Sequence, residues 1–175
     1  GSRRSGGRDG ARWRRLVAIT HRLNDEPRLR ALLELVVDAT VELTGASRGF
    51  VLLKGEDGAL RTRTARNIGA RDLDGDEMAF SRSVAEHVAR TGEALVTVDA
   101  SADGRFHAAA SVAAMQLRSV LAVPLRVHGE VVGTVYVDDR FRAGAFDDDA
   151  VDVARAFADA AAVAIHNAKA RSELQ

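Results

Sequence analysis

The strongest hydrophobic pattern of the chain runs from Leu117 to Asp139, LRSVLAVPLRVHGEVVGTVYVDD. It predicts two β-strands joined by a two-residue turn at His128-Gly129. That turn would pair Leu121 with Tyr136, Val123 with Thr134 and Leu125 with Val132 on one face, and Val120 with Val137, Ala122 with Val135 and Pro124 with Gly133 on the other. Both faces are apolar, so we expect the rest of the chain to cover both of them.

Three longer helices are predicted from apolar residues that recur every three or four positions. The first runs from about Ala11 to the NDEP sequence, and the second starts near Pro27 and ends at Gly45. The last starts at Asp148 with Asp147 as its N-cap. Its apolar arc spans roughly 160°, which is wider than one packed neighbour requires.

The middle of the chain predicts shorter elements. Phe50 to Lys54 is a buried strand, and the following strand carries Arg61 and Arg63, as a charged edge strand does. A short helix is expected over residues 81–91, with Ser83 and Glu86 at capping-box spacing, and EALVTVD is a third short strand. The fold class is therefore α+β, with terminal helices on one face of an antiparallel sheet. The connections between Asn67 and Leu117 would cover the other face, leaving room there for a small-molecule cavity.

Composition indicates one ordinary globular domain of 175 residues, with 46% hydrophobic and 29% charged residues. We expect residues 1–10 to be a linker or tag remnant and residues 11–175 to form the domain. The chain has no apolar run long enough to span a membrane and no secretory signal pattern, so we expect a cytoplasmic domain without a membrane partner. Basic and acidic residues balance at 25 each, which gives no bias toward nucleic acid.

The absence of cysteine excludes several chemistries at once. Disulfides, thiolate nucleophiles, thiol redox reactions, zinc–thiolate sites and cysteine-linked bilins all need that side chain. The sequence also lacks a nucleophile-elbow or phosphate-loop pattern, so we expect no enzyme activity and no catalytic residues. A dispersed Ser/His/Asp site is the alternative that remains.

Metal and haem sites are not expected either. The DLDGDE sequence around Asp74 lacks the spacing of a calcium loop, and helix capping explains Asp147 to Asp149 more simply than magnesium does. A lone haem ligand would have to be His87 or His107, and an ordinary polar histidine is the favoured interpretation. The arginine-rich start has one aromatic, Trp13, and no base-reading motif, so a solvated linker and helix face is preferred to nucleic-acid binding.

Five segments in order, VELTGASRGFVLL, TGEALVTVDA, LRSVLAVPL, GEVVGTVYVDD and GAFDDDAVDVARAFADAAAVAIHNAK, resemble the GAF domain family over nearly the whole chain. The likeness is to sensory GAF domains of bacterial signalling proteins, such as enhancer-binding transcription activators with an AAA+ motor, kinases and cyclases. It implies a sheet of five or six strands ordered 2-1-5-4-3, a ligand pocket opposite the terminal helices, and a homodimer through those helices. It also implies that the domain regulates an output domain in the same parent chain.

Two sets of candidate site residues follow. The ligand-binding candidates are Phe80, Phe106, Met115, Tyr136, Arg66 and Asn67, and the dimer-interface candidates are Trp13, Leu16, Thr20, Leu23, Phe157, Ala161, Ile165 and Ala168. The Asn-Lys motif of the cyclic-nucleotide-binding members is absent, because no lysine lies between Lys54 and Lys169. We expect a small-molecule sensor without a resident cofactor; the alternatives are a dimerisation and signal-relay module without ligand, or an unrecognised small enzyme.

Overall fold

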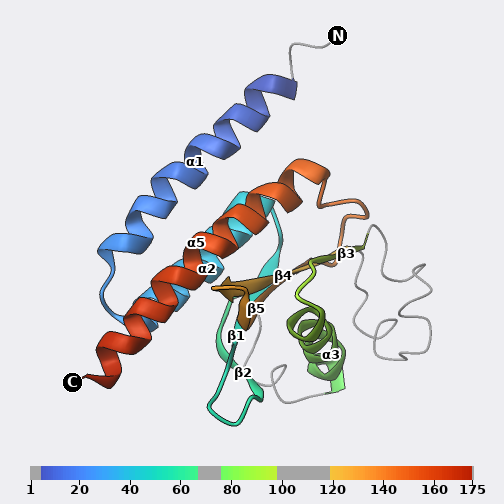
Figure 1. The fold of residues 1–175 in the computed structure, drawn as a ribbon. Coiled ribbons are helices and arrows are strands. Elements are labelled where there is room, and N and C mark those ends of the chain that lie inside the picture. Colours follow the sequence, from blue (N-terminus) through green and yellow to red (C-terminus); the bar gives the residue numbers. More distant parts are fainter. Residues whose placement is uncertain (1–4, 67–75, 98–118, 175) are drawn as a thin grey trace.

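The computed structural model describes residues 5–66, 76–97 and 119–174 (Figure 1). Its elements in chain order are α1 (Ser5–Asp25), α2 (Leu29–Thr44), β1 (Arg48–Lys54), β2 (Leu60–Arg66), α3 (Asp76–Thr91), β3 (Leu95–Thr97), β4 (Ser119–Val127), β5 (Glu130–Asp139) and α5 (Asp148–Glu173). The strands form one antiparallel five-stranded sheet ordered β2-β1-β5-β4-β3. The predicted α+β class and strand order are therefore confirmed.

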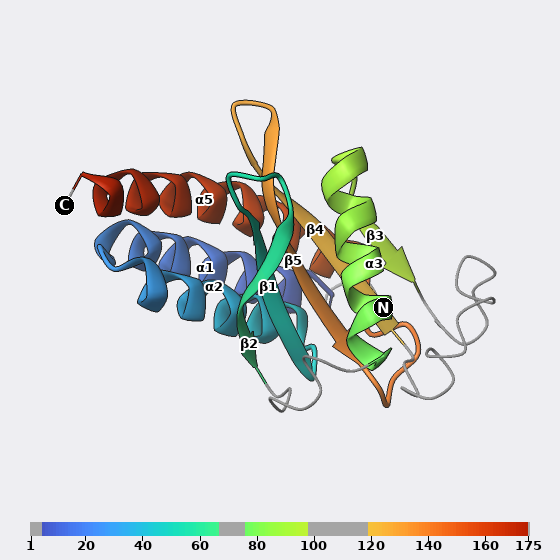
Figure 2. The same cartoon turned by 90° about the horizontal axis from the view of Figure 1, so that it is seen from below.

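Helices cover both faces of this sheet. Helices α1, α2 and α5 lie on one side and α3 lies on the other, as Figure 2 shows from the edge. The apolar core is divided accordingly: residues such as Val123, Leu125 and Val135 face the three-helix side, whereas Phe50, Ala122 and others face α3. The expectation that water reaches neither face of the β4–β5 hairpin is met by this two-sided cover.

The register of that hairpin differs from the prediction. The turn at His128-Gly129 is present, with φ of 52° and 80°, but Leu121 pairs with Val137 and Tyr136 pairs with Ala122. The reason is a bulge: Arg126 pairs with Val131 and Leu125 with Gly133, so Val132 is an extra residue on β5. One extra residue exchanges the faces of everything beyond it, and Tyr136 therefore faces α3.

A glycine next to the bulge permits the sheet to close on β1. A Cβ added at Gly133 would collide with the Leu52 carbonyl oxygen and lie 2.9 Å from Leu53 Cδ2. Gly133 and Leu53 are direct partners in the β1–β5 ladder. The absence of a side chain at Gly133 thus allows the backbones to approach closely where the bulge bends the strand.

Two helices start earlier than the sequence predicts. Helix α1 begins at Ser5 and not near Ala11, so the boundary expected between a linker over residues 1–10 and the domain falls inside a helix. Helix α3 begins at Asp76, so Ser83 and Glu86 lie within it and form no capping box. Once later turns are anchored by packing, a helix extends through residues whose own propensity for it is weak.

Helix α5 begins at Asp148, as predicted. Its wide apolar arc packs against other elements of the same chain, whereas the sequence had suggested a second copy of the protein. Asp147 caps the helix by accepting a hydrogen bond from the Ala150 backbone N–H at 2.7 Å. The helix then contacts β4, α2 and α1, and Figure 1 shows it lying between α1 and the sheet. Three neighbours within one chain therefore use the arc that had suggested a second copy of the protein.

Candidate functional site

A buried ion pair joins two neighbouring strands on the α3 face of the sheet. Arg48, the first residue of β1, lies directly opposite Asp138 of β5. Arg48 Nε donates to Asp138 Oδ1 at 2.6 Å and Nη2 donates to Oδ2 at 3.0 Å. Both side chains are buried. Two parallel bonds between a guanidinium and a carboxylate fix the geometry of both groups and the register of the two strands.

Tyr136 extends this pair into a cluster. Its hydroxyl donates to Asp138 Oδ2 at 2.9 Å, and its ring stacks on that of Phe50 with the ring centroids 4.6 Å apart. Phe50 and Tyr136 are also direct ladder partners, two residues along from Arg48 and Asp138. The side chains of Arg48, Tyr136 and Asp138 therefore form one polar cluster, with an aromatic pair beside it.

The electrostatics of this polar cluster follow from its burial. Burial raises the pKa of Asp138 above its usual value, and the Arg48 guanidinium and the Tyr136 hydroxyl oppose that rise. Burial also raises the pKa of Tyr136 well above its usual value, and the adjacent charge of Asp138 adds to the rise. Tyr136 is therefore a hydrogen-bond donor at neutral pH and cannot act there as a general base.

Helix α3 brings a further hydroxyl to the cluster. Ser81 is buried and lies close enough to Tyr136 to oppose the rise of the Tyr136 pKa. Its geometry nevertheless falls short of a hydrogen bond with any described residue. One turn further along, the Ala85 carbonyl accepts a 3.0 Å hydrogen bond from the Thr134 hydroxyl, which anchors α3 to β5. Ser81 thus offers a buried donor and acceptor next to the cluster.

The family model of the GAF domain matches residues 28–165. The chain belongs to the GAF domain family. GAF domains are typically sensory domains in signalling proteins, and they generally have regulatory roles and sit in multidomain proteins with a kinase or another output domain.

Several solved structures share this fold at low sequence identity. The GAF domain from a phosphoenolpyruvate-protein phosphotransferase of Coxiella burnetii is 17% identical, with 94% of this chain and 98% of that chain covered and a TM-score of 0.72. The free methionine-R-sulfoxide reductase of Neisseria meningitidis, solved with its substrate, is 18% identical, with 94% and 93% covered and a TM-score of 0.72. A domain of a putative two-component sensor histidine kinase from Sinorhizobium meliloti 1021 is 18% identical, with 82% and 94% covered and a TM-score of 0.63. A comparison with curated proteins gave no match.

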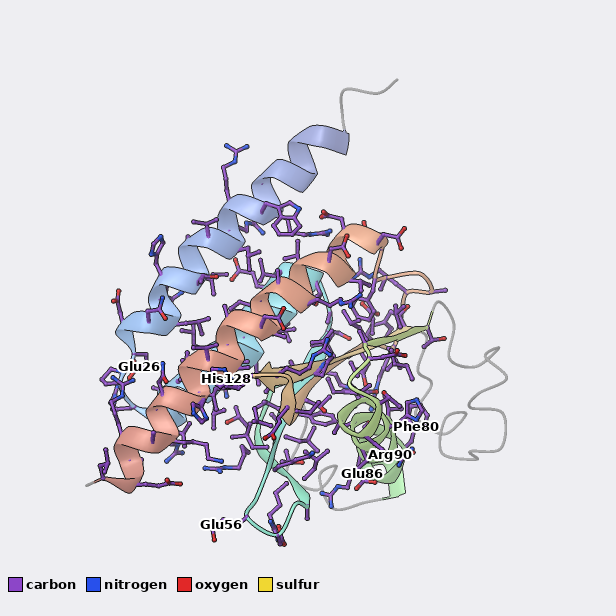
Figure 3. All side chains as sticks on the ribbon, in the orientation of Figure 1. Glu26, Glu56, Phe80, Glu86, Arg90 and His128 are labelled. Carbon is purple, nitrogen blue, oxygen red and sulfur yellow. The ribbon has the colours of Figure 1, made fainter. Side chains whose placement is uncertain are left out.

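The GAF domain brings two of the predicted ligand residues together. Phe80 of α3 and Tyr136 of β5 are both buried in the apolar cluster of the α3 face, and Figure 3 labels Phe80 on α3. Arg66 is turned to the other helix layer, where Arg66 Nε bonds Asp38 Oδ1 of α2 at 2.6 Å. Phe106, Met115 and Asn67 lie outside the described residues.

Arg48, Asp138 and Ser81 are the site residues that the sequence reasoning missed. A signal for the first two was present, because Arg48 begins one apolar strand and Asp138 lies next to the end of another. A charged residue at a strand end is ordinarily read as a solvated terminus. Only the β1–β5 pairing places these two charges opposite each other inside the protein.

No metal site is formed by the described residues: none of their His, Asp and Glu side chains gather in groups of three or more. Asp147 and Asp149 are instead bound by Arg12 of α1, whose Nη1 lies 3.1 Å from Asp147 Oδ1 and 2.8 Å from Asp149 Oδ2. His87 is exposed near Arg90, and His107 is not among the described residues. None of the helices in the described ranges is long and apolar enough to cross a bilayer.

Most of the predicted dimer residues are used inside the single chain. The residues buried in the three-helix core are Leu16, Leu23, Phe157, Ala161, Ile165 and Ala168. Trp13 is 39% exposed and Thr20 is half-buried. A second copy of the GAF domain would therefore have to contact other side chains of α1 and α5, such as the exposed Val17 and Val163.

Proposed function

We propose that this GAF domain is a regulatory sensory domain that binds a small molecule on the α3 face of the sheet. The observation that carries the proposal is the buried polar cluster of Arg48, Tyr136 and Asp138 in a mainly apolar layer. Burying charges costs free energy that a well-packed apolar set of residues would not, so such clusters often mark functional sites. A structural role, fixing the β1–β5 register, is the competing explanation.

The chemistry of the cluster indicates what the ligand must offer. Arg48 and Asp138 neutralise each other, and the buried Ser81 hydroxyl lacks a hydrogen bond to any described residue. The ligand would therefore present an uncharged hydrogen-bonding group to Ser81 and an apolar surface to Phe80 and its neighbours. Neither a resident cofactor nor a metal ion is part of the proposal.

A continuous set of contacts would carry the signal from this site to α5. Asp139, next to Asp138, accepts hydrogen bonds from the backbone N–H groups of Phe141 and Arg142 at 2.8 and 3.0 Å. Ser119 Oγ donates to the Arg142 carbonyl at 2.6 Å and accepts from the Ala145 N–H at 3.1 Å. A shift of the Asp138 end of β5 would thus move the connection that leads into α5 and, in a longer protein, an output domain.

The same proposal includes a homodimer formed by the terminal helices, with their exposed residues in place of the buried set. An AAA+ motor, a kinase or a cyclase would be the regulated output. Any binding to nucleic acid is assigned to a further domain of the parent protein. Catalysis is not part of the proposed function.

The ligand proposal is tested by native mass spectrometry of freshly purified protein and by thermal shift against a metabolite library. We expect a retained or stabilising small molecule, and Ser81→Ala to weaken its binding about tenfold, the effect of one lost hydrogen bond. Ser83→Ala is the matched control, because Ser83 is exposed on the same helix. A ligand that never appears favours the relay module, whereas turnover of any substrate favours an enzyme.

A further inference from the structure

A cleft lies between the last turns of α5 and the sheet, on the face of the sheet opposite α3. Its apolar floor is formed by Leu53 of β1, Val132 of β5 and Ile165 of α5. Leu53 and Ile165 are buried in the core of the three-helix side, and Val132 is half-buried against it. Val132 is also the extra residue of the β5 bulge. The irregularity of the strand therefore contributes part of the floor.

The rim of this cleft carries polar side chains from α5. His166, Lys169 and Glu173 follow one another at spacings of three and four residues, so they lie on one side of the helix. Lys169 is half-buried, whereas His166 and Glu173 are exposed. Lys169 and Glu173 are one turn apart, yet neither forms an ion pair with a described residue. The rim therefore offers a ligand one positive and one negative charge.

The size of the cleft limits what it can hold. Its volume is about 170 Å³. An apolar cavity of about 150 Å³ accommodates a benzene molecule, so this cleft has room for one ring or a short branched chain. Clefts that enclose drug-sized ligands have volumes of about 300–1,000 Å³, which is larger. The volume therefore indicates a ligand with a single small apolar group.

The two rim charges distinguish between the small molecules that fit. An apolar monocarboxylate would pair with Lys169 but bring a second negative charge near Glu173, and an apolar amine would do the reverse. A zwitterion pairs with both side chains at once. Glu173 is the last residue of α5, where the negative end of the helix dipole favours a positive group. The ammonium group of the zwitterion is therefore expected beside Glu173, and its carboxylate one turn earlier beside Lys169.

We propose that this cleft binds a free α-amino acid with an apolar side chain, such as leucine. The carboxylate pairs with Lys169, the ammonium group pairs with Glu173, and the ligand side chain lies on the apolar floor. The site is separate from the one proposed on the α3 face, because the sheet lies between them. A bound amino acid bridges the sheet and the last turns of α5, so it stabilises that end of the helix against the sheet.

The proposal is tested by a methyl NMR titration of the full chain with L-leucine. We expect saturable shifts of the Val132 and Ile165 methyl signals, with a dissociation constant of about 1 mM or below. Isocaproate has the same apolar chain without the ammonium group, and isoamylamine has it without the carboxylate. Each should bind about tenfold more weakly than L-leucine, because each loses one charge-assisted contact.

Charge-neutralising variants identify the residues that hold the ligand. Lys169→Gln and Glu173→Gln should each weaken L-leucine binding about tenfold. Arg171→Gln is the matched control, because it removes a charge from the same turns of α5 at a position that lines a different cleft. Thermal unfolding of the three variants without ligand checks that each retains the fold. Equal weakening by the control would contradict a specific contact with Lys169 and Glu173.

Three outcomes would overturn the proposal, and one of them leaves the proposed function standing. Methyl signals of Val132 and Ile165 that do not move with about 10 mM L-leucine, L-isoleucine or L-phenylalanine would show that the cleft is not an amino-acid site. Isocaproate that binds as tightly as L-leucine would show that the ammonium group makes no contact. Shifts confined to Phe80 and Tyr136 would place the ligand on the α3 face, which contradicts this cleft but supports the sensory site proposed there.

Discussion

Arg48 and Asp138 are cross-strand partners whose side chains meet inside the protein, with 2.6 Å between Nε and Oδ1. We expect Asp138→Asn to destabilise the fold by about 3–5 kcal/mol, because it leaves the guanidinium buried beside a neutral amide. Urea unfolding monitored by circular dichroism measures the loss. The double variant Arg48→Met with Asp138→Leu should recover most of it, and failure to recover would show that the ion pair stabilises the fold itself.

The pKa of Asp139, the next residue on β5, is shifted in the opposite direction from that of Asp138. Burial opposes the charge of Asp139, but the Phe141 and Arg142 backbone N–H groups and the Arg142 guanidinium outweigh it, so the pKa of Asp139 is lowered. Its stabilisation is then complete above pH ~4, the unfolded value, and is lost as the pH falls through the folded value. We expect Asp139→Asn to cost about 1–3 kcal/mol at pH ~7. The difference from wild type should shrink below pH ~4 in paired urea titrations; a constant difference would contradict the assignment.

Tyr136 is the only tyrosine of the chain, so tyrosinate absorbance reports on it alone. Because its pKa is raised well above the usual value by burial, we expect no ionisation of the folded protein near pH ~10. The stability that the protonated hydroxyl contributes is present below that pH and is lost as the pH rises further. Absorbance and circular dichroism should therefore change together, and ionisation that precedes unfolding would show an exposed phenol.

A side-chain methyl group added at Gly133 would have very different neighbours from one added at Gly58. We expect Gly133→Ala to destabilise by more than about 2 kcal/mol, because the new Cβ collides with the Leu52 carbonyl oxygen. Gly58→Ala is the control, since nothing lies within 4 Å of its Cβ and only its φ of 80° is unfavourable. That change should cost about 1 kcal/mol. Thermal unfolding of the two variants distinguishes a steric from a purely conformational penalty.

Substitutions at Phe157 and Val163, both on α5, should affect the stability of the fold and the association of two copies differently. Phe157→Ala should cost about 3–5 kcal/mol, because the ring is buried in the three-helix core. Val163→Asp should change stability by less than about 0.5 kcal/mol while weakening the proposed dimer, because Val163 is exposed on α5. Thermal unfolding and light scattering measure both variants, and a strong loss of fold in Val163→Asp would show that the side chain packs within the chain.

The sequence by itself determined the elements of this protein and the order in which they pair. Apolar periodicity and capping residues such as Asp147 and Gly45 are local signals, so they define where helices and strands lie. The segments that resemble the GAF family gave the strand order. The turn at His128-Gly129 was visible because a two-residue turn demands positive φ.

Only the tertiary structure decided which residues meet. The extra residue Val132 turned Tyr136 toward α3; an isolated glycine such as Gly133 suggests a bulge, but only the pairing of β4 with β5 locates the extra residue. Arg48 and Asp138 are far apart in the chain, and pairing of β1 with β5 makes them one site. Likewise, the width of the apolar arc of α5 indicated how much of the helix surface would be buried. It did not indicate which elements would pack against that surface. Contact with α1, α2 and β4 within the chain buries most of the residues predicted for the dimer interface.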